Sequence, residues 1–223
     1  NQPNPFWEIY NGLAENTEFK NYFVNRYADL MNTVFTANQY TPIVDSMYNQ
    51  LLPELPRHFQ TWTGDIPGGM ATYDAIHDQL LNDFSLRSDV VRNQIVNEFS
   101  LVKKVNVTLN VQPEGAGYIK ISTIVPDELP WTGVYFDGVP VRMTAVANPG
   151  YTFSSWQVNS LIPGAELLNE SIELNVSTSE FFKAMFIGTE EPLAVTISEI
   201  HYNPETSVDG GNWIELHNFG STP

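Results

Sequence analysis

The chain has 223 residues, of which 42% are hydrophobic and 13% aromatic, enough apolar side chain to fill folded cores and to argue against disorder. Its net charge of −16 is spread along the whole length without a basic stripe, which argues against nucleic acid and anionic membrane surfaces as partners. Cysteine is absent, which excludes thiol catalysis and disulfides, and no apolar run reaches the roughly 20 residues of an inserted membrane span.

The first hundred residues carry apolar side chains at helical spacing. We expect a short helix from about Pro5 to Leu13, followed by a longer helix that Asn16 or Thr17 caps. One stripe defines the longer helix: Phe19, Tyr22, Phe23, Tyr27, Leu30, Met31 and Val34.

Three further stripes follow. Thr41-Pro42 is a good helix start, and Pro53 and Pro56 are expected to kink or interrupt that helix. Residues 64–69 are predicted to form a loop, and two more stripes lie beyond it. The three stripes are Val44, Met47, Tyr48, Leu51, Leu52 and Leu55; Tyr73, Ile76, His77, Leu80, Leu81 and Phe84; and Leu86, Val91, Ile95 and Phe99. Short loops between such helices predict an antiparallel bundle over residues 1–102.

This helical region resembles the C-terminal helical part of the CotH kinase-like family. The residues that carry the resemblance are Asn4-Pro-Phe6, Phe23-Val-Asn-Arg-Tyr-Ala-Asp-Leu30, Leu52-Pro-Glu54, Arg57-His58, Trp62 and Arg87. Members of that family resemble secreted or spore-coat atypical protein kinases that use ATP and a divalent metal such as Mg²⁺. Their metal and nucleotide motifs precede this region, so the resemblance implies ATP and Mg²⁺ for a longer parent only. No catalytic or cofactor-binding residue is expected in this chain.

At about Lys104 the hydrophobic period changes from helical to alternating, and turn signals recur every ten residues or so. Val105, Val107, Leu109 and Val111 alternate with polar residues, as in a half-buried strand. Asp137-Gly138 is a hairpin signal, because a primed turn needs positive φ. About seven strands over residues 104–188 predict an Ig-like β-sandwich. The expected fold class is therefore multidomain α plus β, with a helical bundle, this sandwich and a partial β module.

The string Gly138-Val-Pro-Val-Arg-Met-Thr-Ala, continued by Gly150-Tyr-Thr-Phe-Ser-Ser-Trp156, resembles the divergent Ig-like repeat of bacterial surface proteins. The resemblance implies a spacer or adhesion unit. Four aromatic side chains are candidates for a sugar-stacking platform: Trp131, Tyr135, Tyr151 and Trp156. Trp156 and Phe153 are expected in the core, which leaves Trp131 and Tyr135 as the ligand-binding candidates.

The tail, residues 193–223, contains Val195-Thr-Ile-Ser-Glu-Ile-His-Tyr-Asn-Pro204 and Asn212-Trp-Ile-Glu-Leu-His-Asn218, two strands that a loop over Glu205–Gly211 would join. The pair resembles the truncated start of a lamin-tail domain, an Ig-like module of exported bacterial proteins. Because two strands alone are marginal in water, we expect them to lean on the neighbouring sandwich or to pair with another chain.

Two acidic and two histidine side chains of this tail form a candidate Zn²⁺ site. Glu199 and His201 are two residues apart, as are Glu215 and His217, so each pair occupies one strand face. Ile200, Tyr202, Ile214 and Leu216 would then take a buried face. Simple alternation of solvent-facing polar residues explains the same pattern, and we favour it; no bound metal is expected.

These observations predict a non-catalytic, internal piece of a large exported bacterial surface protein that serves as scaffold or spacer and binds protein or glycan. One alternative is the C-terminal part of a CotH-type kinase whose active site lies upstream. Another is a carbohydrate-binding module that uses Trp131 and Tyr135. A helical lobe without its partner should also expose an apolar patch, which favours a homodimer through the helices or exposed edge strands.

Overall fold

The structure is a computed structural model that describes the chain except for residues 1–4, 160–163, 165, 190–194, 203–210 and 220–223. Helices precede Lys104 and strands follow it, which confirms the predicted α plus β order. The helices are α1 (Pro5–Ala14), α2 (Thr17–Thr33), α3 (Ala37–Leu51), the 3-10 helix η1 (Leu52–Glu54), α4 (Leu55–Trp62) and α5 (Ile66–Glu98).

The helix starts follow the capping residues with one difference. The side chain of Asn16 accepts a hydrogen bond from the Phe19 N–H at 3.0 Å, which confirms the cap predicted for α2. Helix α3 begins at Ala37, five residues before Pro42, the first helical residue that the sequence indicated, and Pro42 lies inside it. A proline this close to the helix start removes one intrahelical hydrogen bond, a loss that a 15-residue helix absorbs.

Helix α5 differs most from the prediction. The last two stripes, expected as separate helices, belong to one helix of 33 residues. The loop expected over residues 64–69 is shorter, because Asp65 caps α5 by accepting from the Gly68 N–H at 3.0 Å, and the helix begins at Ile66. Pro67 fits the first turn, where its missing N–H costs nothing.

Seven strands follow, as predicted: β1 (Lys104–Gln112), β2 (Gly117–Ile121), β3 (Trp131–Phe136), β4 (Val141–Ala147), β5 (Tyr151–Val158), β6 (Ser171–Leu174) and β7 (Glu180–Gly188), with the 3-10 helix η2 (Glu166–Leu168) before β6. They form a sheet of order β3-β1-β7-β5 and a sheet of order β2-β4-β6. Buried side chains of both sheets form one core, which includes Trp156 as expected. We call these seven strands the sandwich.

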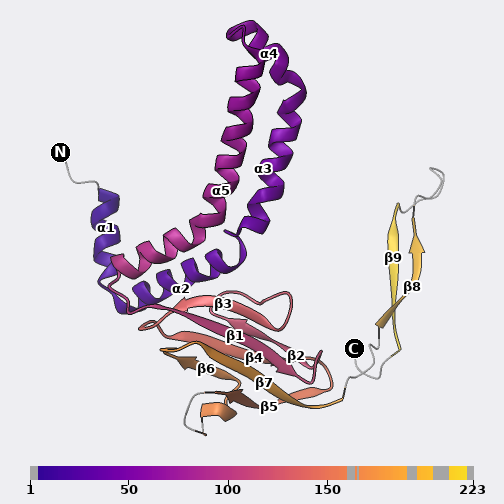
Figure 1. The fold of residues 1–223 in the computed structure, drawn as a ribbon. Coiled ribbons are helices and arrows are strands. Elements are labelled where there is room, and N and C mark those ends of the chain that lie inside the picture. The colour runs from indigo at the N-terminus through magenta and orange to yellow at the C-terminus, as the bar shows by residue number, and fades with distance from the viewer. Residues whose placement is uncertain (1–4, 160–163, 165, 190–194, 203–210, 220–223) are drawn as a thin grey trace.

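Helix α2 lies against the edge of the sandwich at β3, with α1 beside its N-terminal end (Figure 1). Helices α3 and α4 run alongside the N-terminal part of α5 and project away from the sandwich as a long hairpin (Figure 1). We call residues 37–90 of this hairpin the arm. The C-terminal part of α5 returns to α2, and Ile95 is buried there. We call α2 together with this part of α5 the base.

The tail forms the predicted hairpin of antiparallel strands β8 (Val195–His201) and β9 (Trp213–Asn218). Residues 205–210 of the expected loop lie outside the described residues. The face expected to be buried is exposed: Ile200, Tyr202, Ile214 and Leu216 are all more than half accessible. The hairpin also stands away from the sandwich (Figure 1), so it does not lean on that module, and the alternative that it pairs with another chain stays a prediction. Among the described residues, no second layer packs on this two-stranded sheet, so its apolar side chains stay open to solvent.

Candidate functional site

Three polar side chains of α2 face the sandwich. Asn25, Asp29 and Asn32 are spaced by four and three residues, so they share one helical face. All three hydrogen-bond to groups between Thr123 and Pro140. We call this contact the joint. It was not predicted from the sequence, in which the spacing of these residues marks one polar face of the helix but not what that face contacts.

Asp29 is the centre of the joint and is fully buried. Its Oδ1 accepts from the Tyr135 hydroxyl at 2.8 Å. Its Oδ2 accepts from the Thr123 N–H at 2.9 Å and from the Thr123 hydroxyl at 2.6 Å. Burying a carboxylate is costly unless donors replace its water, and three donors do so here. The Thr123 hydroxyl also accepts from Arg26 Nη1 at 2.7 Å, which brings a positive charge close to the carboxylate.

Tyr135 is buried along with its partner. Burial raises the pKa of its hydroxyl well above 10, and the neighbouring Asp29 charge raises it further. The tyrosine therefore stays protonated and remains a donor to Asp29 throughout the ordinary pH range.

Asn32 covers the free edge of β3. Its Oδ1 accepts from the Val134 N–H at 3.0 Å, and its Nδ2 donates to the Val134 carbonyl at 3.0 Å. The side-chain amide thus pairs with both backbone groups of this edge residue, as a neighbouring strand would. Arg92 of α5 donates to Asn32 Oδ1 at 2.9 Å and to the Met31 carbonyl at 3.0 Å. The Asn32 side chain therefore links α2 both to β3 and to α5.

Apolar packing closes the joint around these bonds. Val24, Ala28 and Ile95 belong to the same core as the buried residues of the sandwich. On another side of α2, the Phe23 ring contacts the rings of Tyr10, Phe19, Tyr27 and Phe99 at centroid distances of 4.8 to 5.9 Å. Helix α2 is thus packed on two sides, which fixes the base from which the arm projects.

The arm is built differently, because none of its residues 37–90 is buried. Side-chain contacts across the hairpin hold α3 against α5. The rings of Tyr40 and Phe84 stack at 4.6 Å, and those of Tyr48 and Tyr73 at 5.0 Å. His77 Nε2 lies 2.8 Å from Asp45 Oδ1.

A groove of about 190 Å³ runs along the arm between α3 and α5, and we call it the arm groove. Its lining is Val44, Met47, Tyr48, Leu51, Tyr73, Ile76, His77 and Leu80. Two of the stripes predicted as helix cores thus meet across the arm, but they remain open to solvent. The Tyr48 hydroxyl donates to Asp74 beside this groove, and that hydrogen bond raises the pKa of Tyr48 to about 12.

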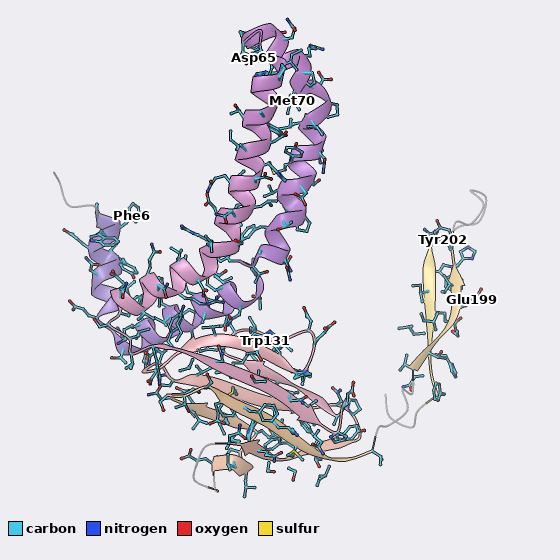
Figure 2. The ribbon with its side chains drawn as sticks, in the orientation of Figure 1. Phe6, Asp65, Met70, Trp131, Glu199 and Tyr202 are labelled. Atoms are coloured by element: carbon cyan, nitrogen blue, oxygen red, sulfur yellow. The ribbon has the colours of Figure 1, made fainter. Side chains whose placement is uncertain are left out.

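The two sugar-binding candidates lie close together in sequence but in different surroundings. Tyr135 is fully buried and bonded to Asp29, so its ring has no face open to a sugar. Trp131 is half-buried on β3, on the side of the sandwich nearest the helices (Figure 2). Its ring lies over Gly133 of the same strand, next to Asn32. The expected platform of these two rings is therefore not present.

The four Zn²⁺ candidates are not gathered into one cluster. Glu199 and Glu215 are direct cross-strand neighbours, whereas His217 lies opposite Thr196 and His201 opposite Trp213, on whose ring it stacks at 5.1 Å. A bulge between Ile197 and Glu199 shifts the register, and the two histidines lie toward opposite ends of the hairpin. Within the described ranges, no three His, Cys, Asp or Glu side chains come together to hold a metal ion.

Across the residues that the structure describes, no helix is both long and apolar enough to cross a membrane.

Of the comparisons with known proteins, one gave a match, and it covers the helical part of the chain. Neither the curated proteins nor the solved structures gave a match. The family model described as CotH kinase protein matches residues 1–90, which include α1 to α4 and most of α5. The helical part of this chain is therefore similar to the CotH kinase protein family, as its sequence motifs indicated.

Proposed function

We propose that this chain is a non-catalytic scaffold and interaction unit of an exported bacterial surface protein. The observation that carries the proposal is the contrast between the joint and the arm. The joint buries a carboxylate among three donors, whereas the arm has no buried side chain over residues 37–90. A fixed base with a projecting, uncovered helical hairpin suits a part that presents a contact surface.

The base holds the arm in one direction because two kinds of contact act together. The bonds that Asp29 accepts from Tyr135 and that Asn32 donates to Val134 fix where α2 lies along β3, and the shared apolar core resists its sliding. Arg92 then links the returning part of α5 to the same helix. The partner on the arm is a protein or a glycan. The resemblance of the β regions to bacterial surface modules supports an exported location.

The orientation of the arm can be measured directly, because the chain contains no cysteine. Gln60→Cys in α4 and Lys120→Cys in β2 replace exposed residues and would carry spin labels. We expect one narrow distance distribution by pulsed electron resonance, and a broader one when Asp29→Ala is added. A broad distribution in the chain without Asp29→Ala would contradict the scaffold proposal.

A second candidate function follows from the family match over residues 1–90. In that case the helices contribute to an ATP- and Mg²⁺-dependent kinase of CotH type, whose active-site residues come from a region upstream of this chain. The two candidates differ in one assay. Transfer of labelled phosphate from ATP, with Mg²⁺, by this chain alone would overturn the non-catalytic proposal. Activity confined to a chain extended at its N-terminus would favour the kinase reading of the parent.

A further inference from the structure

The arm groove has the form of a helix-binding site. Its walls are pairs of apolar side chains one helical turn apart, Met47 and Leu51 on α3 and Ile76 and Leu80 on α5. These four side chains are 41% to 62% exposed, a large accessible fraction for residues of this size in a folded protein. Two antiparallel helices cannot enclose a core by themselves, and a third helix laid along them would complete a small bundle.

The apolar surface continues over α5. A second, shallower depression is lined by Ala71, Thr72, Ala75, Ile76, Gln79 and Leu80, so it shares Ile76 and Leu80 with the arm groove. Ala71 and Ala75 are one turn apart and have small side chains. Small residues at this spacing allow another helix to approach within the roughly 8–10 Å of close helix packing.

The charge around the groove selects the partner. Residues 37–90 contain seven Asp or Glu against two Arg and no Lys. Asp78 stands on α5 with an 83% exposed side chain, and Asp45 on α3 is 45% exposed. Asp45 and Asp78 both lie within ion-pair distance of His77, which lines the groove. A ligand in the groove thus meets apolar walls with carboxylates beside them.

We propose that the arm groove binds an amphipathic helix of a partner protein, a helix with an apolar face and a Lys- or Arg-rich polar face. The inference rests on the proposed function, since it names the partner class of the arm. Apolar anchors at helical spacing would fill the groove, and the basic flanks would lie near Asp45, Asp74 and Asp78. A second copy of this chain fits less well, because it brings the same acidic surface to the contact.

The test uses the full chain and a fluorescent synthetic helix of Leu and Lys in which the leucines occupy one face. Two control peptides are a scrambled sequence of the same composition and a Leu and Glu helix of the same pattern. Fluorescence anisotropy at about 50 and about 500 mM salt would separate apolar from charge contributions. We expect the amphipathic Leu/Lys helix to bind at least about tenfold more tightly than either control at the lower salt, and more weakly at the higher salt.

Matched variants locate the site. Ile76→Lys places a positive charge in the groove wall and should weaken binding about tenfold or more, because it opposes both the apolar and the charge contribution. Ile43→Lys changes an equally exposed isoleucine of α3 that does not line the groove, and it should have little effect. Asp78→Asn should weaken binding about threefold at low salt only.

Equal binding of all three peptides, or equal weakening by Ile76→Lys and Ile43→Lys, would overturn the inference. A dimer of the unliganded chain by light scattering that Ile76→Lys dissociates would also overturn it, by making a second copy the occupant. The proposed function fails separately, through phosphoryl transfer or a mobile arm. A chain that has a rigid arm and no phosphoryl transfer but does not bind the peptide would refute only the helix-binding inference.

Discussion

The Tyr135 hydroxyl donates a 2.8 Å hydrogen bond to the Asp29 carboxylate inside the protein, and this bond joins α2 to β3 across 106 positions of sequence. Both residues are fully buried. The pair couples the helices to the sandwich. Both side chains are buried, so when one is removed no water replaces the hydrogen bond that the other has lost.

Asp29→Ala is expected to destabilise the protein by roughly 3 kcal/mol, because it leaves the Tyr135 hydroxyl and both Thr123 donors without an acceptor. Asp29→Asn should lose less, since one acceptor oxygen remains. Urea unfolding followed by tryptophan fluorescence measures both. Asp83→Ala, an exposed carboxylate of α5, is the control and should change stability by less than about 0.5 kcal/mol. Equal losses for Asp29→Ala and Asp83→Ala would show that the joint contributes no stability.

The raised pKa of Tyr135 predicts a loss of stability at alkaline pH. In the unfolded chain this hydroxyl loses its proton near pH 10, whereas in the folded protein it keeps it to well above that value. The stabilisation is therefore complete below pH 10 and is lost as the pH rises from 10 toward the folded-state pKa. Unfolding free energies between pH 8 and about pH 11 should fall less steeply in Tyr135→Phe. A slope of unfolding free energy against pH that is unchanged by Tyr135→Phe would refute this assignment.

Asn32 should protect the edge of β3 from water. Asn32→Ala removes the only side chain seen, among the residues described, to bond both backbone groups of Val134, and it should cost about 2 kcal/mol. The sharper measurement is hydrogen exchange, in which the Val134 amide should become markedly faster while the Val107 amide of the central strand β1 changes only with global stability. If the Val134 amide exchanges at the same rate in both proteins, the edge is protected by something other than Asn32.

Gly133 leaves the space in which Asn32 and Trp131 meet. A Cβ at this position would lie 2.3 Å from Trp131 Cη2 and 2.9 Å from Asn32 Nδ2. The Trp131 ring would have to swing away and Asn32 would lose its bonds, so Gly133→Ala should destabilise the protein by about 2 kcal/mol in thermal or urea unfolding. Gly12→Ala in α1 meets nothing within 4 Å and should be neutral or stabilising by up to about 1 kcal/mol. Matching effects of the two substitutions would mean that the contact at Gly133 is not tight.

Much of this fold follows from hydrophobic period alone. Alternation after Lys104 predicted the seven strands, and the central strands β1 and β7 show it most fully, because buried and accessible residues alternate along both. The break expected between Phe84 and Leu86 was wrong, because the stripe changes phase there without a helix-ending residue. The phase changes since α5 packs on α3 and α4 over its first part and on the base near Ile95 over its last.

The joint could not be predicted from the same rules. The predicted core stripe of α2 includes Tyr22 and Val34, yet both are more than half exposed, whereas the buried Asn25 and Asp29 lie outside every predicted stripe. Polar side chains are buried here because the free edge of β3 offers backbone groups that only polar side chains can satisfy. Which strand edge a helix will meet depends on tertiary arrangement, and a single sequence does not contain that information in any local pattern.

The tail hairpin should be weakened by its own charges. Glu199 and Glu215 lie directly opposite each other across β8 and β9, and like charges at that position repel. Glu215→Lys replaces the repulsion with attraction and should stabilise the hairpin by about 0.5 kcal/mol, seen as slower exchange of its cross-strand amides. Thr196→Lys changes the charge by one, against two for Glu215→Lys, and lies opposite His217 rather than a carboxylate, so it should slow exchange by less than half as much. Added salt screens the glutamate repulsion, so it should narrow the difference between the original chain and Glu215→Lys. Slowing by Thr196→Lys that reaches half of that by Glu215→Lys would instead trace the effect to net charge, since the chain is acidic throughout.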